Sequence, residues 1–133
     1  MRNAVLADND AIATVAVKDL SIARAFYGDA LGLVEQPDSD NPQVITYASG
    51  NSKLGVYASQ FAGTNKATSV TWAVGELEPI VETLRAKGVT FEHYDLPQLT
   101  LRGDIHVAAD GFQVVWFKDP DGNILSILSA PGR

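Results

Sequence analysis

The segment from Trp116 to Leu128, WFKDPDGNILSIL, carries the clearest signal of the fold. It consists of two short apolar runs joined by a turn. Pro120 fixes φ near the value that the second turn position requires, Asp119 can accept hydrogen bonds from the turn backbone, and Gly122 can adopt a positive φ. Short apolar runs bounded by turn residues are typical of strands rather than of a helix. The segment therefore predicts a β-hairpin near the C-terminus.

Outside this hairpin, the sequence pattern predicts the same order of elements twice. In the first half, Asp19 or Ser21 can cap a helix that extends to Ala30, and hydrophobic runs predict strands at 12–17, 33–36, 43–48 and 53–59. In the second half, a helix is expected at 76–87 between strands at 69–74 and 89–94, and the hairpin supplies the last two strands. Each half therefore has the order βαβββ.

A faint sequence repeat accompanies this order, because Thr14-Val15-Ala16-Val17 matches Thr71-Trp72-Ala73-Val74 at three positions of four. A unit that cannot bury its own sheet face must pack against a copy of itself. The sequence thus predicts an α+β fold. Two βαβββ modules are expected to form a curved, cup-like, eight-stranded mixed sheet with the helices outside.

Length and composition restrict the class of protein. A chain of 133 residues, 46% of them hydrophobic, suits one domain, 1–133, with modules at about 12–59 and 69–129 and an N-terminal tail at 1–11. The absence of cysteine excludes disulfides, thiolate catalysis and cysteine-ligated metals. No apolar run reaches the roughly 18 residues of a membrane span, and the first ten residues contain no secretory signal. The net charge of −6, with no basic run, disfavours nucleic acid. We expect a cytoplasmic protein.

Several short motifs together resemble the vicinal oxygen chelate superfamily, which includes glyoxalases, bleomycin-resistance proteins and extradiol dioxygenases. The match extends from about Ile12 to Leu128. Its motifs are Val17-Lys18-Asp19-Leu20, Phe26-Tyr27, Leu31-Gly32-Leu33, Ala86-Lys87-Gly88-Val89 and Phe117-Lys118-Asp119-Pro120-Asp121-Gly122-Asn123. The resemblance implies the paired βαβββ fold and commonly a homodimer. It does not fix the chemistry, because one fold hosts many functions.

Enzymes of that superfamily usually hold a divalent metal in the cup with His, Gln and Glu side chains. The resemblance places the corresponding positions at Ile12, Gly55, Ser69 and Ser126. Isoleucine and glycine have no donor side chain, and a neutral serine binds divalent ions weakly. We therefore expect no metal and no cofactor.

The only two histidines, His93 and His106, are the weak candidates for catalysis. Together with Glu92, Asp95 and Asp104 they could form a displaced metal site, and either could act as a general base. Two ordinary histidines in a loop or at a strand end are the simpler alternative, because their spacing matches no metal-binding motif.

The second half also contains a long stretch without clear periodicity, from Leu96 to Phe112. Such stretches are often lids or binding loops, and here the stretch could cover the mouth of the cup and bring His106 into it. A surface loop with a short strand near 105–107 is the alternative.

Strand parity predicts which side chains line the cup, because alternate residues of a strand face the same side. With Ser69 and Ser126 facing inwards, as the resemblance implies, Val115, Phe117 and Trp72 are expected to pack under the helices. The candidate ligand-binding residues are then Tyr57, Ser69, Thr71, Val114, Trp116, Ser126 and His106. Such an aromatic and hydroxyl-bearing lining is typical of small-molecule sites. Alternatively, these residues simply fill the cup as core.

Three functions remain open at this point. The first is a metal-free protein that binds a small organic molecule in the cup, similar to the drug-sequestering members of the superfamily. The second is a lyase, isomerase or oxygenase with a rearranged metal site or a histidine general base. The third is a dimerising domain with a filled cup.

Overall fold

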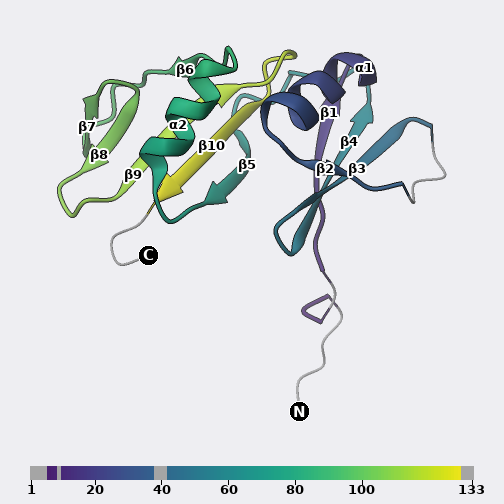
Figure 1. Ribbon diagram of the computed structural model, residues 1–133, viewed down its shortest axis with the longest axis horizontal. Coiled ribbons are helices and arrows are strands. Elements are labelled where there is room, and N and C mark those ends of the chain that lie inside the picture. Colours follow the sequence, from purple (N-terminus) through teal and green to yellow (C-terminus); the bar gives the residue numbers. More distant parts are fainter. Residues whose placement is uncertain (1–5, 9, 38–41, 130–133) are drawn as a thin grey trace.

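Both halves of the chain contain the predicted order of one strand, a helix and further strands (Figure 1). The computed structural model describes residues 6–8, 10–37 and 42–129. The first half comprises β1 (Ala13–Val17), α1 (Leu20–Ala23), a π-helical segment η1 (Arg24–Ala30), β2 (Val34–Glu35), β3 (Val44–Ser49) and β4 (Ser52–Ala58). The second half comprises β5 (Thr68–Ala73), α2 (Leu77–Ala86), β6 (Phe91–Glu92), β7 (Leu99–Arg102), β8 (Ile105–Ala108), β9 (Gln113–Lys118) and β10 (Ile124–Ser129).

The strands form one sheet in each half. The first sheet has the order β1-β4-β3-β2, and the second has the order β5-β10-β9-β8-β7 with β6 paired to β9. The pairs β1–β4 and β5–β10 are parallel, and the other pairs are antiparallel. Figure 1 shows the two halves side by side, and their edge strands β1 and β5 approach each other between them. The α+β class and the paired arrangement are as the sequence predicts.

The number of strands differs from the prediction. The described residues contain ten strands rather than eight, because the stretch at 96–112 is not an irregular loop. It contains the hairpin β7–β8, and His106 of β8 pairs with Val114 of β9. This stretch therefore widens the second sheet, which corrects its expected role as a loop over the mouth of the cup. Gly103, with φ of +61°, opens a two-residue Gly-Asp turn, which is a known hairpin signal.

The helix starts and the core follow from local chemistry. Asp19 caps α1 as predicted, because its Oδ1 accepts hydrogen bonds from the backbone N–H groups of Ser21 and Ile22 at 2.8 and 3.3 Å. Val115 and Phe117 are fully buried on the helix side of β9, and Trp72 packs on the helix side of β5. Strand parity is therefore correct for all three. No helix in the described ranges is long and apolar enough to cross a membrane.

A buried carboxylate joins the two halves. Tyr27 of η1 donates its hydroxyl hydrogen to Oδ2 of Asp119 at 2.6 Å. Asn123, in the same turn as Asp119, donates from Nδ2 to the backbone oxygen of Ala16 in β1 at 2.7 Å. The turn that predicts the hairpin thus also attaches the second half to the first.

Candidate functional site

The sheet faces turned away from the helices form what we call the cup face. In the second half this face is defined by the side chains that alternate with the buried core residues Val115, Phe117, Leu125 and Ile127. Ser126 lies between Trp116 and Thr71 in the strand ladders. The hydroxyl oxygens of Thr71 and Ser126 are 2.6 Å apart and share a hydrogen bond.

Three aromatic side chains cluster on this face. The His106 ring centroid is 5.0 Å from that of Trp116 and 6.3 Å from that of Tyr94, and the Tyr94 and Trp116 centroids are 5.3 Å apart. Val114 is the ladder partner of His106 and is also buried. Tyr94 is a site residue that sequence analysis missed. It lies in the predicted strand at 89–94, two residues beyond Glu92, the ladder partner of Trp116, so strand parity could have placed its side chain on the same face as Trp116.

His106 is held in one orientation by the backbone. Its Nε2 accepts a hydrogen bond from the Tyr94 N–H at 3.0 Å, so the proton of the neutral ring is on Nδ1. The residue is 1% exposed, and Nδ1 has no hydrogen-bond partner among the described residues. A general base needs a free lone pair within reach of its substrate. Because the lone pair of Nε2 is already used, this geometry does not favour His106 as a base.

The remaining predicted site residues lie elsewhere on the sheets. Tyr57 is in the first sheet, opposite Ala16 and Val44, and is 37% exposed. Ser69 occupies an irregularity of β5, where the register shifts between Thr68 and Val70. The predicted lining therefore falls into a compact group in the second half and separate positions nearer the first half.

The four positions that the resemblance assigns to metal ligands carry side chains poorly suited to a divalent ion. The side chain of Ile12 comes within 3.8 Å of where a β-carbon would stand on Gly55, so an aliphatic group occupies that side. On the other side, the Ser126 hydroxyl is bonded to Thr71. Divalent metals prefer carboxylate and imidazole donors. Within the described ranges no three His, Cys, Asp or Glu side chains gather in a way that could hold a metal.

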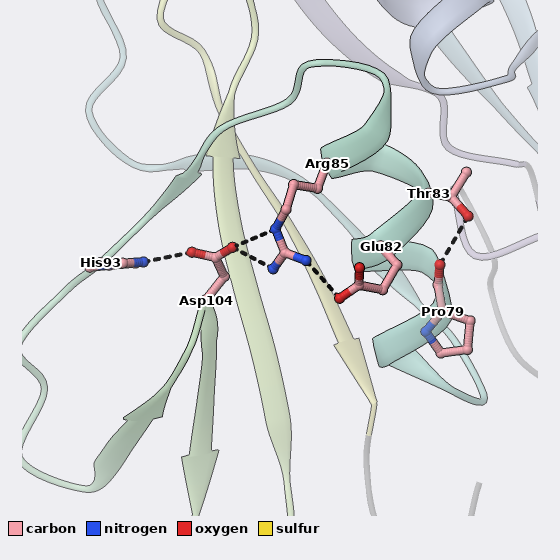
Figure 2. Close-up of polar contacts among 6 residues, drawn as sticks. All are labelled: Pro79, Glu82, Thr83, Arg85, His93 and Asp104. Atoms are coloured by element: carbon pink, nitrogen blue, oxygen red, sulfur yellow. Dashed lines mark hydrogen bonds and ion pairs between the residues drawn. The ribbon is translucent and has the colours of Figure 1, made fainter.

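His93 belongs to a separate network on the outside of the second half (Figure 2). Its Nε2 lies 2.8 Å from Oδ1 of Asp104, and Oδ2 of Asp104 accepts from the guanidinium of Arg85 in α2 at 2.6 Å. Arg85 also pairs with Glu82 at 2.6 Å. The hydrogen bonds from His93 and Arg85 hold the pKa of Asp104 below its ordinary value. This network ties the β7–β8 turn to α2, and it separates His93 from His106.

Replacing Asp104 with asparagine tests this network. Since its pKa is lower in the folded state, Asp104 stabilises the protein above its ordinary pKa of 3.8, and this contribution is lost as pH falls through the lowered pKa. At pH 6 we expect Asp104→Asn to cost about 1 kcal/mol, because the pairs are partly solvated. Urea denaturation at several pH values should show the gap to wild type closing under acidic conditions. Asp95→Asn, at an exposed position, is the control, and a gap independent of pH would contradict the assignment.

Comparison with known proteins places this geometry in a fold family. No protein-family model matches the chain, and no curated protein matches it in sequence. Solved structures match over nearly the full length. A member of the glyoxalase/bleomycin resistance protein/dioxygenase superfamily from Sphaerobacter thermophilus is 20% identical, with 95% of this chain and 100% of the other covered and a TM-score of 0.66.

Two further structures carry functional names. Lactoylglutathione lyase from Agrobacterium tumefaciens is 17% identical, with 92% and 94% of the two chains covered and a TM-score of 0.69. TnmS3, an antibiotic-binding protein from a Streptomyces species, is 16% identical, with 95% and 98% covered and a TM-score of 0.64. The chain therefore has the fold of the glyoxalase/bleomycin resistance protein/dioxygenase superfamily, the vicinal oxygen chelate fold that its motifs predict.

Proposed function

We propose that the protein binds a small, mostly planar organic molecule on the cup face, without a metal ion. The observation that carries the proposal is the cluster of Tyr94, His106 and Trp116 beside the hydroxyls of Thr71 and Ser126. Aromatic rings offer a large stacking area at low entropic cost, and hydroxyl groups can orient a ligand through hydrogen bonds. Tyr57 and Ser69 would contact the ligand from the side of the first half, and Val114 would form part of the floor.

One of the similar structures supports a binding role by analogy. A solved protein of the same fold is named as an antibiotic-binding protein, and the family metal positions here carry Ile12, Gly55, Ser69 and Ser126. The alternative is a lyase, isomerase or oxygenase, and it would need a donor set other than those four residues. We further propose a cytoplasmic homodimer, since two-fold dimers are the commonest closed assemblies.

Native mass spectrometry of the purified protein tests metal content and assembly together. We expect the mass of two chains with no added zinc, nickel, manganese or iron, because isoleucine, glycine and serine replace the usual donors. One tightly held metal per chain would overturn the metal-free proposal. A monomer mass across a wide range of protein concentration would overturn the dimer.

Ligand binding is tested with the neutral, planar fluorescent probe N-phenyl-1-naphthylamine. In a Trp72→Phe variant, Trp116 is the only tryptophan, so its emission reports on the cup face. We expect the probe to change this emission. Replacing Trp116 with alanine should weaken binding, measured by probe fluorescence, by about 1–3 kcal/mol because a stacked ring is lost.

A matched control makes the result specific. Phe61→Ala also removes an aromatic ring, but from an exposed position away from the cluster, and should leave probe affinity unchanged. Equal affinity in wild type and Trp116→Ala, or no binding in either, would contradict the proposal and favour a filled cup.

A further inference from the structure

A second pocket opens where the first strands of the two halves meet. It has a volume of about 370 Å³ and lies between the start of β1, the end of β5 and the turn between β3 and β4. We call it the seam pocket. The residues that matter for its chemistry are Ile12, Ser49, Ser52, Lys53, Thr71 and Trp72. Thr71 also reaches the cup face, but Tyr94, His106 and Trp116 do not line the seam pocket.

One side of the seam pocket is apolar. Ile12 lines the pocket and is 52% exposed. The Trp72 Nε1–H donates to the Ser49 hydroxyl oxygen at 2.9 Å. The polar group of the indole is therefore satisfied within the protein, and the ring offers apolar surface. This side suits the hydrocarbon part of a ligand.

Polar groups also line the seam pocket. Among the described residues, no carboxylate lies within ion-pairing distance of the Lys53 ammonium group. The Ser49 oxygen accepts from Trp72, so its own hydroxyl hydrogen remains available. The Ser52 hydroxyl donates to the Ser49 backbone oxygen at 2.7 Å, which fixes the turn that carries Lys53.

The charge of the seam pocket is opposite to that of the whole protein. The chain has a net charge of −6, yet among the described residues no Asp or Glu lines this pocket, and Lys53 is the one charged side chain that does. A lysine ammonium group is suited to bind a carboxylate through a charge-assisted hydrogen bond. The pocket thus combines an apolar wall with a single cationic end.

We propose that the seam pocket binds a small amphipathic carboxylate, with the carboxylate on Lys53 and the hydrocarbon part against Ile12 and Trp72. The site is distinct from the aromatic cluster on the cup face and does not depend on ligand binding there. It requires no metal, since an ammonium group supplies the positive charge.

The two tryptophans allow the two sites to be observed separately. In a Trp116→Phe variant, Trp72 is the only tryptophan and reports on the seam pocket. This variant is titrated with octanoate, octanamide and octylammonium, which share a chain length and differ in charge. We expect octanoate to change Trp72 emission at concentrations about tenfold lower than octanamide, because the charged head group gains an ion-paired hydrogen bond. Octylammonium should bind most weakly.

Lys53 variants in the same background complete the test. Lys53→Met should abolish the preference for octanoate over octanamide, and Lys53→Arg should retain it. Lys66→Met removes the same charge at an exposed position that does not line the pocket, and should bind octanoate like the parent. Equal affinities for octanoate and octanamide, unchanged binding by Lys53→Met, or no response of Trp72 to any of the three probes would overturn the proposal. None of these outcomes bears on the binding of N-phenyl-1-naphthylamine to the cup face, which is measured separately with Trp116 in place.

Discussion

Replacing Asp119 with alanine is expected to lower the free energy of unfolding by roughly 3–5 kcal/mol, as removing one partner of a buried charged network does. The Asp119 side chain is buried and accepts four hydrogen bonds. Oδ1 accepts from the backbone N–H groups of Asp121 and Asn123, both at 2.9 Å. Oδ2 accepts from the Tyr27 hydroxyl at 2.6 Å and from Nδ2 of Asn123 at 2.8 Å.

The loss would extend beyond the turn itself. Burial, together with the Asp119 charge and hydrogen bond, raises the pKa of Tyr27 far above its ordinary value, so the hydroxyl remains a donor at any working pH. Without Asp119 this donor is left buried and unpaired, which costs about 1–3 kcal/mol on its own. Tyr27→Phe in the Asp119→Ala background should therefore recover part of the stability.

Urea denaturation of wild type, Asp119→Ala and the double variant measures the loss of unfolding free energy and its partial recovery. Asp110→Ala is the matched control, because Oδ1 of Asp110 accepts from the Phe112 N–H at 3.0 Å in a similar turn, but at an exposed position. We expect Asp110→Ala to cost less than about 1 kcal/mol. Similar losses for the two alanine variants would show that Asp119 acts only within its own turn and does not join the halves.

The same residue illustrates how far the sequence could predict the fold. Local patterns predicted that Asp119 bonds its own turn, because the residues concerned are at most four positions apart. The bond to Tyr27 joins positions 92 residues apart, so it depends on the packing of η1 against the second half, which periodicity does not encode. The hairpin at 99–108 was anticipated only in part, as the alternative of a short strand near 105–107, for a different reason. Its Gly103-Asp104 turn is a hairpin signal, but the flanking strands are short and only partly apolar.

The candidate site also has a part that local sequence patterns could predict and a part that depends on long-range packing. Strand parity correctly placed Thr71, Trp116 and Ser126 on one face, because the alternation of side chains is a local property. His106 is a strand residue rather than part of a loop, and its pairing with the Tyr94 N–H required the position of β8 beside β9. The seam pocket was not predicted, because it exists only where strands of two different sheets approach each other.

Replacing Gly63 with alanine is the second change expected to have a large effect. Gly63 lies in the segment between the two halves, with φ of +74°, and a β-carbon there would stand 2.0 Å from the backbone oxygen of Asp121. That oxygen is backbone in the turn around Asp119, so it cannot rotate away as a side chain would. We expect a loss of roughly 2–4 kcal/mol, which combines the strain of positive φ with overpacking.

The contribution of the contact alone can be separated from that of backbone strain. Gly103→Ala introduces a similar strain, since Gly103 has φ of +61°, but nothing lies within 4 Å of the added β-carbon. We expect Gly103→Ala to cost only about 1 kcal/mol, the usual penalty for a non-glycine residue in this region. The excess loss in Gly63→Ala, measured by urea denaturation, is then the cost of forcing the connecting segment away from the Asp121 turn. Equal losses in the two variants would mean that the segment can move aside, and that the close approach of Gly63 to Asp121 does not hold the two halves together.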